Sequence, residues 1–211
     1  MGQHSERARE HLLDAAEELF ASEGIDAVSN RRIAEHAGNA NHSAVKYHFG
    51  GREELLRAIT ARGRENVSER RAALQAELGP EPNLRAIITI GILPWVDYLD
   101  SLPVPSWRAR FLAQASTSPV LGEIIRDYVL DAHDFVGLLR NDIPELAAIP
   151  RPIIEARSRI LAQLILGLAA EHEARLAAGT SEGTWHSFGH FLTDAAVGML
   201  AAEVTQPGNF E

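Results

Sequence analysis

Apolar residues recur at helical spacing along the chain, and no segment shows the two-residue alternation of a β-strand. In residues 6–23, Leu12, Ala15, Ala16, Leu19 and Phe20 form one stripe, which predicts an amphipathic helix. The same spacing predicts further helices from Arg52 to about Leu78 with an interruption at Gly63, and at 83–101, 106–116, 119–141, 152–178 and 184–203. We therefore predict an all-α fold.

Two short helices are predicted between the first helix and the one that begins at residue 52. Ser29 is suited to cap the first of them, because its hydroxyl can accept from an unpaired N–H of the first turn, and Gly38 ends it. Asn41, with Ser43 as the competing choice, is predicted to cap the second, which ends at Gly50. Such a pair joined by a glycine-containing turn forms a helix-turn-helix, whose second helix enters the DNA major groove. An ordinary helical hairpin with a solvated polar face is the alternative.

The polar side of the second short helix carries groups that can contact DNA. Cationic, hydroxyl and imidazole groups can anchor to phosphate, whereas amide, imidazole and hydroxyl groups can also reach base edges. The predicted phosphate contacts are Arg31, Lys46 (the only lysine of the chain), Tyr47, His48 and Arg52. The predicted base-facing residues are Asn41, His42, Ser43 and Ala44, and Ser29 completes the predicted DNA-binding set.

Short motifs follow one another in a fixed order across roughly residues 8 to 60. They are Ala15-Ala16-Glu17-Glu18-Leu19-Phe20, Glu23-Gly24-Ile25, Ala37-Gly38, Tyr47-His48-Phe49-Gly50 and Arg52-Glu53-Glu54-Leu55-Leu56. In kind and spacing this series resembles the N-terminal domain of tetracycline-repressor (TetR) type regulators. The chain departs from the family pattern by one extra residue between Ala37-Gly38 and Tyr47. It also has Lys46 where the family usually has a phosphate-contacting tyrosine.

The resemblance implies how the chain is organised and what it does. It implies a DNA-binding domain at residues 1–52 and a helical effector-binding and dimerisation domain at residues 53–211. It also implies a transcriptional repressor that binds a palindromic operator in double-stranded DNA as a homodimer and is released by a small ligand. The last two helices have apolar residues on more than one face, which fits pairing between two copies. Burial of those faces within one monomer is the alternative.

Aromatic residues gather in the middle of the chain, where the resemblance implies an effector cavity. Apolar walls with a few polar groups are typical of small-molecule pockets, although the same residues can also form a dry core. We therefore expect a mainly apolar effector and no cofactor. The predicted ligand-binding residues are Trp95, Tyr98, Trp107, Phe111, Gln114, Tyr128 and His133.

His186, His190 and Asp194 share one helix face and form the basis of a competing interpretation. Residues four apart on a helix can hold a metal ion such as Zn²⁺, so a metal-dependent helical enzyme is one alternative. The face lacks the glutamate of an HExxH motif, and we predict no metal site and no catalytic residue. A dimerisation module without DNA binding is the other alternative.

The net charge of −9 does not favour DNA binding, but the acid is unevenly distributed. Residues 1–71 hold eleven Lys and Arg against twelve Asp and Glu, so most of the negative charge lies further along the chain. Nearby cations act on phosphate at contact distance, whereas distant acids are screened. The chain has no cysteine, no apolar run of the length of a membrane span, and no signal-peptide pattern, so we expect a cytoplasmic protein.

Overall fold

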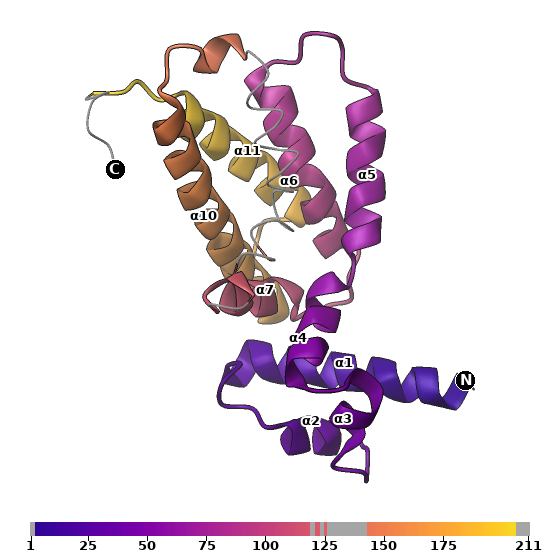
Figure 1. Ribbon diagram of the computed structural model, residues 1–211. Helices are drawn as coiled ribbons and strands as arrows, with labels where there is room; N and C mark the ends of the chain where they lie inside the picture. The colour runs from indigo at the N-terminus through magenta and orange to yellow at the C-terminus, as the bar shows by residue number, and fades with distance from the viewer. Residues whose placement is uncertain (1–2, 119–120, 123–124, 126–142, 206–211) are drawn as a thin grey trace.

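The computed structural model describes residues 3–118, 121–122, 125 and 143–205 (Figure 1). Its helices are α1 (Gln3–Glu23), α2 (Asn30–His36), α3 (Ala44–Phe49), α4 (Arg52–Ala61), α5 (Arg64–Ala76), α6 (Leu84–Asp100), α7 (Arg108–Ser116), the 3₁₀ helix η1 (Pro144–Leu146), α10 (Arg151–Ala177) and α11 (Trp185–Ala201). No β-strand occurs among these residues, which confirms the all-α prediction. None of the helices described is long and apolar enough to cross a membrane. The predicted helix at 119–141 lies almost wholly outside the described residues.

Helices α1–α4 form the lower part of the molecule in Figure 1 and share one core. Phe20 of α1, Ile33 of α2, Val45 of α3, and Leu55 and Ile59 of α4 are all fully buried there. The two short helices cannot bury enough surface by themselves, so α1 and α4 supply the rest of this core. The packing holds α2 and α3 in a fixed relation to each other.

The chain between residues 52 and 78 forms two helices, and the predicted interruption at Gly63 is confirmed. Gly63 has a φ of 77°, in the left-handed region that favours glycine. A Cβ atom at this position would lie only 2.1 Å from Cζ of Tyr98. The break at Gly63, which packs closely against Tyr98 of α6, therefore lies where the lower part of the molecule joins the rest of the chain.

The upper part consists of α5, α6, α10 and α11, with α7 at its lower end beside α1 (Figure 1). Helix α6 runs unbroken through Pro94 and buries most of its residues, including Ile88 and Trp95. It packs along α11 and beside α5, while α10 packs against α7 and α11. Helix α7 therefore contacts both the upper part and α1.

Candidate nucleic-acid interface

The turn between α2 and α3 is held together by two asparagine side chains. The Oδ1 atom of Asn39 accepts from the backbone N–H of Asn41, and Oδ1 of Asn41 accepts from the N–H of Ser43, both at 2.9 Å. Ser43 is the N-cap of α3, and its side chain makes no capping hydrogen bond. The prediction that Asn41 caps the helix is wrong, because its carboxamide closes the turn instead. Ser29 caps α2 as predicted, accepting from the N–H of Arg32 at 3.1 Å.

The outer surface of this turn and of α3 is polar and exposed. Tyr47 is 75% exposed, and Lys46 is exposed beside it. The other exposed residues of the predicted set are Ser29, Arg31, Asn41, His42 and Ser43, and His48 is half-buried with its ring against that of Tyr47. We call Asn41–Ser43 together with Lys46 and Tyr47 the recognition surface. These side chains point to solvent because Val45 anchors the opposite side of α3 in the core.

The side chains of two residues predicted to contact DNA are directed into the protein instead of toward solvent. Ala44 is only 1% exposed, so its side chain packs in the core and does not face outward. The guanidinium of Arg52 lies 4.9 Å from the ring centroid of Phe20 and donates to the carbonyl oxygen of Ile25. It also donates to Oδ1 of Asn30 at 3.4 Å. The structure thus assigns Arg52 a role in holding α1, α2 and α4 together, which the sequence did not reveal.

An acidic side chain lies next to the recognition surface. Glu35 accepts from Nε of Arg31 at 2.8 Å and lies 3.6 Å from Nε2 of His42. The hydrogen bond from Arg31 is the main cause that lowers the pKa of Glu35. Its carboxylate orients Arg31 and His42, and it also offsets part of the positive charge of Arg31 near DNA.

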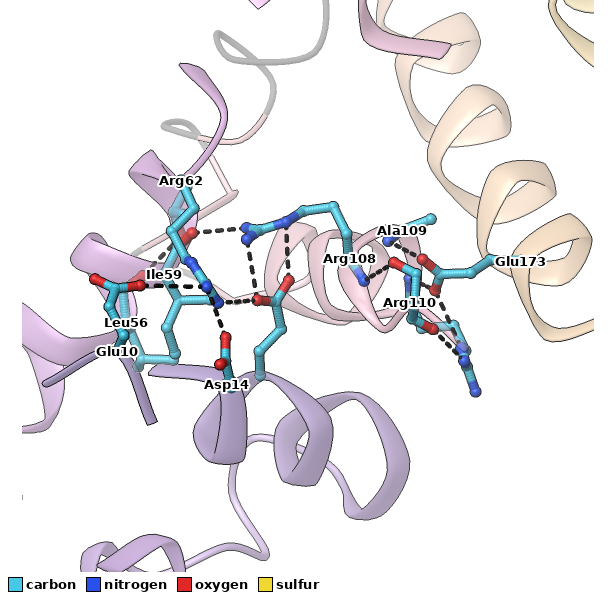
Figure 2. A network of polar contacts seen from close by, with 12 residues as sticks. Glu10, Asp14, Leu56, Ile59, Arg62, Arg108, Ala109, Arg110 and Glu173 are labelled. Atoms are coloured by element: carbon cyan, nitrogen blue, oxygen red, sulfur yellow. Dashed lines mark hydrogen bonds and ion pairs between the residues drawn. The ribbon is translucent and has the colours of Figure 1, made fainter. Parts of the chain in front are cut away.

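A buried ion-pair network joins α1 to α7 and to the end of α4. Nε and Nη2 of Arg108 lie 2.8 Å and 3.0 Å from the two carboxylate oxygens of Glu17, and Nη1 donates to the carbonyl oxygen of Ile59 at 2.7 Å. Arg62 donates to Glu17 at 2.8 Å and to Asp14 at 2.6 Å. Figure 2 shows Arg62 and Arg108 reaching the same part of α1. We call Glu17, Arg62 and Arg108 the interdomain network.

The interdomain network was not predicted, although the sequence contains a signal for part of it. Glu17 stands four residues after Leu13 and three before Phe20, so it falls on the buried face of α1. Burial raises the pKa of the Glu17 carboxyl, and the guanidinium charges of Arg108 and Arg62 oppose that rise. A charged residue at a core position needs a partner, and here the partner lies 91 residues away in the chain.

Helix α7 is fastened on its other side to α10. Both carboxylate oxygens of Glu173 accept from backbone N–H groups at the start of α7, from Ala109 at 3.0 Å and from Arg110 at 3.1 Å. The side chain of Arg110 also donates to Glu173 at 3.1 Å, and its guanidinium lies 3.9 Å from the ring centroid of Trp107. Glu173 thus satisfies unpaired N–H groups at the positive end of the helix.

The predicted ligand-binding residues fall into separate environments. Trp95 is fully buried, and its indole N–H has no acceptor among the described residues. Phe111 stacks on Phe20 with ring centroids 6.3 Å apart, and Gln114 donates to the carbonyl oxygen of Ala21 at 3.0 Å. Both of these residues therefore connect α7 to α1. Tyr128 and His133 lie outside the described residues.

Tyr98 and Trp107 share a cleft of about 320 Å³. The cleft lies between α1, which contributes Asp14 and Glu18, and the segment that joins α6 to α7. Arg62 and Arg108 also line it, so the interdomain network forms part of its wall. Neither Phe111 nor Gln114 lines this cleft.

On the α11 face that forms the alternative metal site, His186 and His190 lie close together, but Asp194 does not join them. Nε2 of His186 and Nε2 of His190 lie 3.2 Å apart. Asp194 instead accepts from Arg85 of α6 at 2.5 Å. Within the described part of the chain, no three His, Cys, Asp or Glu side chains are placed to hold one metal ion.

The exposed recognition surface, the short α2–turn–α3 unit and the packing of α1 across it define a helix-turn-helix DNA-binding regulator. Residues 12–59 match the family described as "Bacterial regulatory proteins, tetR family". The HTH-type transcriptional regulator AcrR of Shigella flexneri is 30% identical over 169 residues, which cover 75% of this chain and 74% of that protein. The chain belongs to the tetR family, and it is a DNA-binding transcriptional regulator.

Solved structures show the same fold over nearly the whole chain. A TetR-like transcriptional regulator from Rhodococcus sp. RHA1 superposes with a TM-score of 0.57 at 18% identity, covering 93% of this chain and 97% of that one. A bacterial regulatory protein in the tetR family from Rhodococcus RHA1 gives a TM-score of 0.54 at 22% identity, covering 95% and 98%. At these identities the likeness concerns the fold alone.

Proposed function

We propose that the chain is a repressor that binds a palindromic operator as a homodimer and leaves it when a small, mainly apolar ligand binds. The observation that supports this most is the recognition surface, with exposed Asn41, His42, Ser43, Lys46 and Tyr47 on a helix pair fixed from behind by Val45. A dimer places two such surfaces in successive major grooves about 34–36 Å apart.

In this proposal each side chain of the recognition surface has a defined role. Lys46 and Tyr47 contact phosphate, and Asn41, His42 and Ser43 face base edges. Arg31 contacts phosphate from α2 in competition with its hydrogen bond to Glu35. Ala44 and Arg52 are not included, because both side chains are directed into the protein.

The exposed apolar side chains of α10 and α11 support pairing of two copies. Ile160 and Leu164 of α10 are 50% and 44% exposed, and Phe191 of α11 is 57% exposed. Gly167 and Gly198, on the same two helices, allow helix axes to approach closely. Burying these side chains against a second copy removes apolar surface from water, and the two-fold pairing gives a four-helix bundle.

For the domain division we propose residues 1–52 as the DNA-binding part and residues 53–211 as the effector-binding and dimerisation part. Helix α4 belongs to the second part by this division, but its Leu55 and Ile59 pack in the core of the first. The effector is proposed to contact Tyr98 and Trp107, which share a cleft. Trp95, one turn before Tyr98 on α6, is fully buried and does not line this cleft.

The interdomain network is the proposed route from effector to DNA. Arg62 and Arg108 line the cleft and also bind Glu17 of α1. A ligand in this cleft contacts both guanidiniums, so its binding changes how α7 and α4 hold α1, and with it the spacing of the two recognition surfaces. Phe111 and Gln114 support this role, because both contact α1 directly.

The proposed contacts are tested by two substitutions measured against several DNA sequences and salt concentrations. We expect Lys46→Ala to weaken binding to all sequences alike. It should also reduce the slope of log binding constant against log salt concentration by about one in magnitude, because it removes one phosphate contact. His42→Ala is expected to change sequence preference instead, at a cost of about 1–3 kcal/mol for the preferred base. A Lys46→Ala protein with unchanged affinity across the salt titration contradicts the assignment.

A further inference from the structure

Two histidines on the surface of α11 lie one helical turn apart with their ring nitrogens close together. His186 and His190 are both exposed, and their rings meet edge to face with centroids 4.6 Å apart. The two Nε2 atoms are 3.2 Å apart. This is hydrogen-bonding distance, so the two rings already contact each other at the surface of the helix.

This separation is that of a hydrogen bond between the rings, and it also lies in the range that a metal ion imposes on two neighbouring ligands. With Zn–N bonds of 2.0–2.1 Å, two nitrogens on adjacent corners of a tetrahedron lie roughly 3.3–3.4 Å apart, and at right angles roughly 2.8–3.0 Å apart. The observed 3.2 Å falls between the two values. We propose that His186 and His190 form a chelating site for a divalent transition-metal ion, namely Cu²⁺, Ni²⁺ or Zn²⁺.

The two imidazoles are the only ligands that the described residues offer to this ion. Asp194 lies on the same face but is held by Arg85 of α6 at 2.5 Å, and no third His, Cys, Asp or Glu is placed beside the pair in the described part of the chain. Water therefore fills the remaining coordination positions. The site is a surface chelate, distinct from a closed structural site with four protein ligands.

The chemistry of the ligands determines which ions bind. Imidazole nitrogen suits Cu²⁺, Ni²⁺ and Zn²⁺, whereas Mg²⁺ and Ca²⁺ prefer oxygen. Cu²⁺ is expected to bind most tightly, following the general order of stability of divalent ions. A bound imidazole must be unprotonated, so binding weakens in acid. The ion would bridge one turn of α11 and so favour its helical form.

Titration calorimetry on untagged full-length protein tests the site with CuCl₂, NiCl₂, ZnCl₂ and MgCl₂ as separate probes. We expect one ion of the first three per chain and no binding of Mg²⁺. His186→Gln and His190→Gln should each weaken binding by at least about tenfold, since loss of even an outer-shell partner commonly costs that much. His11→Gln removes a different exposed helical histidine and serves as the matched control.

The titrations of the parent and the three variants decide whether the two histidines bind the ion. Retained binding in His11→Gln together with loss in both His186→Gln and His190→Gln supports the chelate. Absence of Cu²⁺ binding by the unchanged protein overturns it, and so does a His190→Gln variant that binds as tightly as the parent. Because DNA is absent from this assay, its result does not depend on the proposed function.

Discussion

The ion pair between Glu17 and Arg108 should contribute strongly to stability because both side chains are buried. Glu17 is 6% exposed and Arg108 is 3% exposed. In Glu17→Met the guanidinium of Arg108 keeps the carbonyl oxygen of Ile59 as an acceptor but loses both carboxylate contacts. Removing one partner of a buried pair costs about 3–5 kcal/mol, and we expect a loss in this range.

Arg108→Met should lower the free energy of unfolding by less than Glu17→Met does, because Glu17 keeps a second partner. Glu17 still accepts from Arg62 at 2.8 Å in that variant, so we expect a loss of about 2–3 kcal/mol. The double variant leaves no uncompensated charge at Arg108. The decrease in the free energy of unfolding of the double variant should therefore be smaller than the sum of the two single decreases by roughly 2 kcal/mol, as expected for residues in direct contact.

Urea unfolding followed by helical circular dichroism measures these differences, with all variants at one protein concentration because association affects apparent stability. Arg57→Met is the matched control. Arg57 pairs with Glu53 at 2.7 Å, but both side chains are at least half exposed, so its loss should stay below about 1 kcal/mol. Additive losses in the double variant, or a Glu17→Met loss as small as that of the control, would refute the reasoning.

Three further predictions concern other parts of the protein. Burial, with a smaller contribution from Arg175, lowers the pKa of His172, so the unfolded chain takes up a proton as the pH falls below about 6.5 and the folded protein does so only at lower pH. Stability should fall from pH 7 to pH 5 more steeply in the parent than in His172→Phe, as measured by urea unfolding at each pH. Gly63→Ala should lower the free energy of unfolding by about 2–4 kcal/mol through strain and the clash with Tyr98, and adding Tyr98→Leu should recover the steric part. Leu164→Glu places a charge on the exposed stripe of α10 and should shift light scattering from dimer to monomer, whereas a monomeric parent would contradict the proposed interface.

The helices could be predicted from sequence because their apolar periodicity directly reflects burial. The bounds expected for α10 and α11 agree with the structure to within two residues, and the break at Gly63 was identified from the glycine alone. These features depend on residues close together in the chain, where spacing and local propensity carry the information.

The site was predictable only in part, because side-chain direction depends on contacts that are remote in sequence. Arg52 was expected to meet phosphate, but the ring of Phe20 and the carbonyl of Ile25 draw it inward. Asn41 is predicted to cap α3, yet its carboxamide closes the turn before that helix instead. The pairing of Glu17 with Arg108 joins positions 91 residues apart, and no local pattern identifies such a partner.

The central claim is that two recognition surfaces read one face of a DNA duplex together. Selection of bound sequences from random DNA by the full-length protein tests it most directly. The account predicts two inverted half-sites whose centres lie about 10 base pairs apart or a multiple of that distance. Enrichment of a single half-site without a symmetric partner, or no enrichment at all, would contradict it.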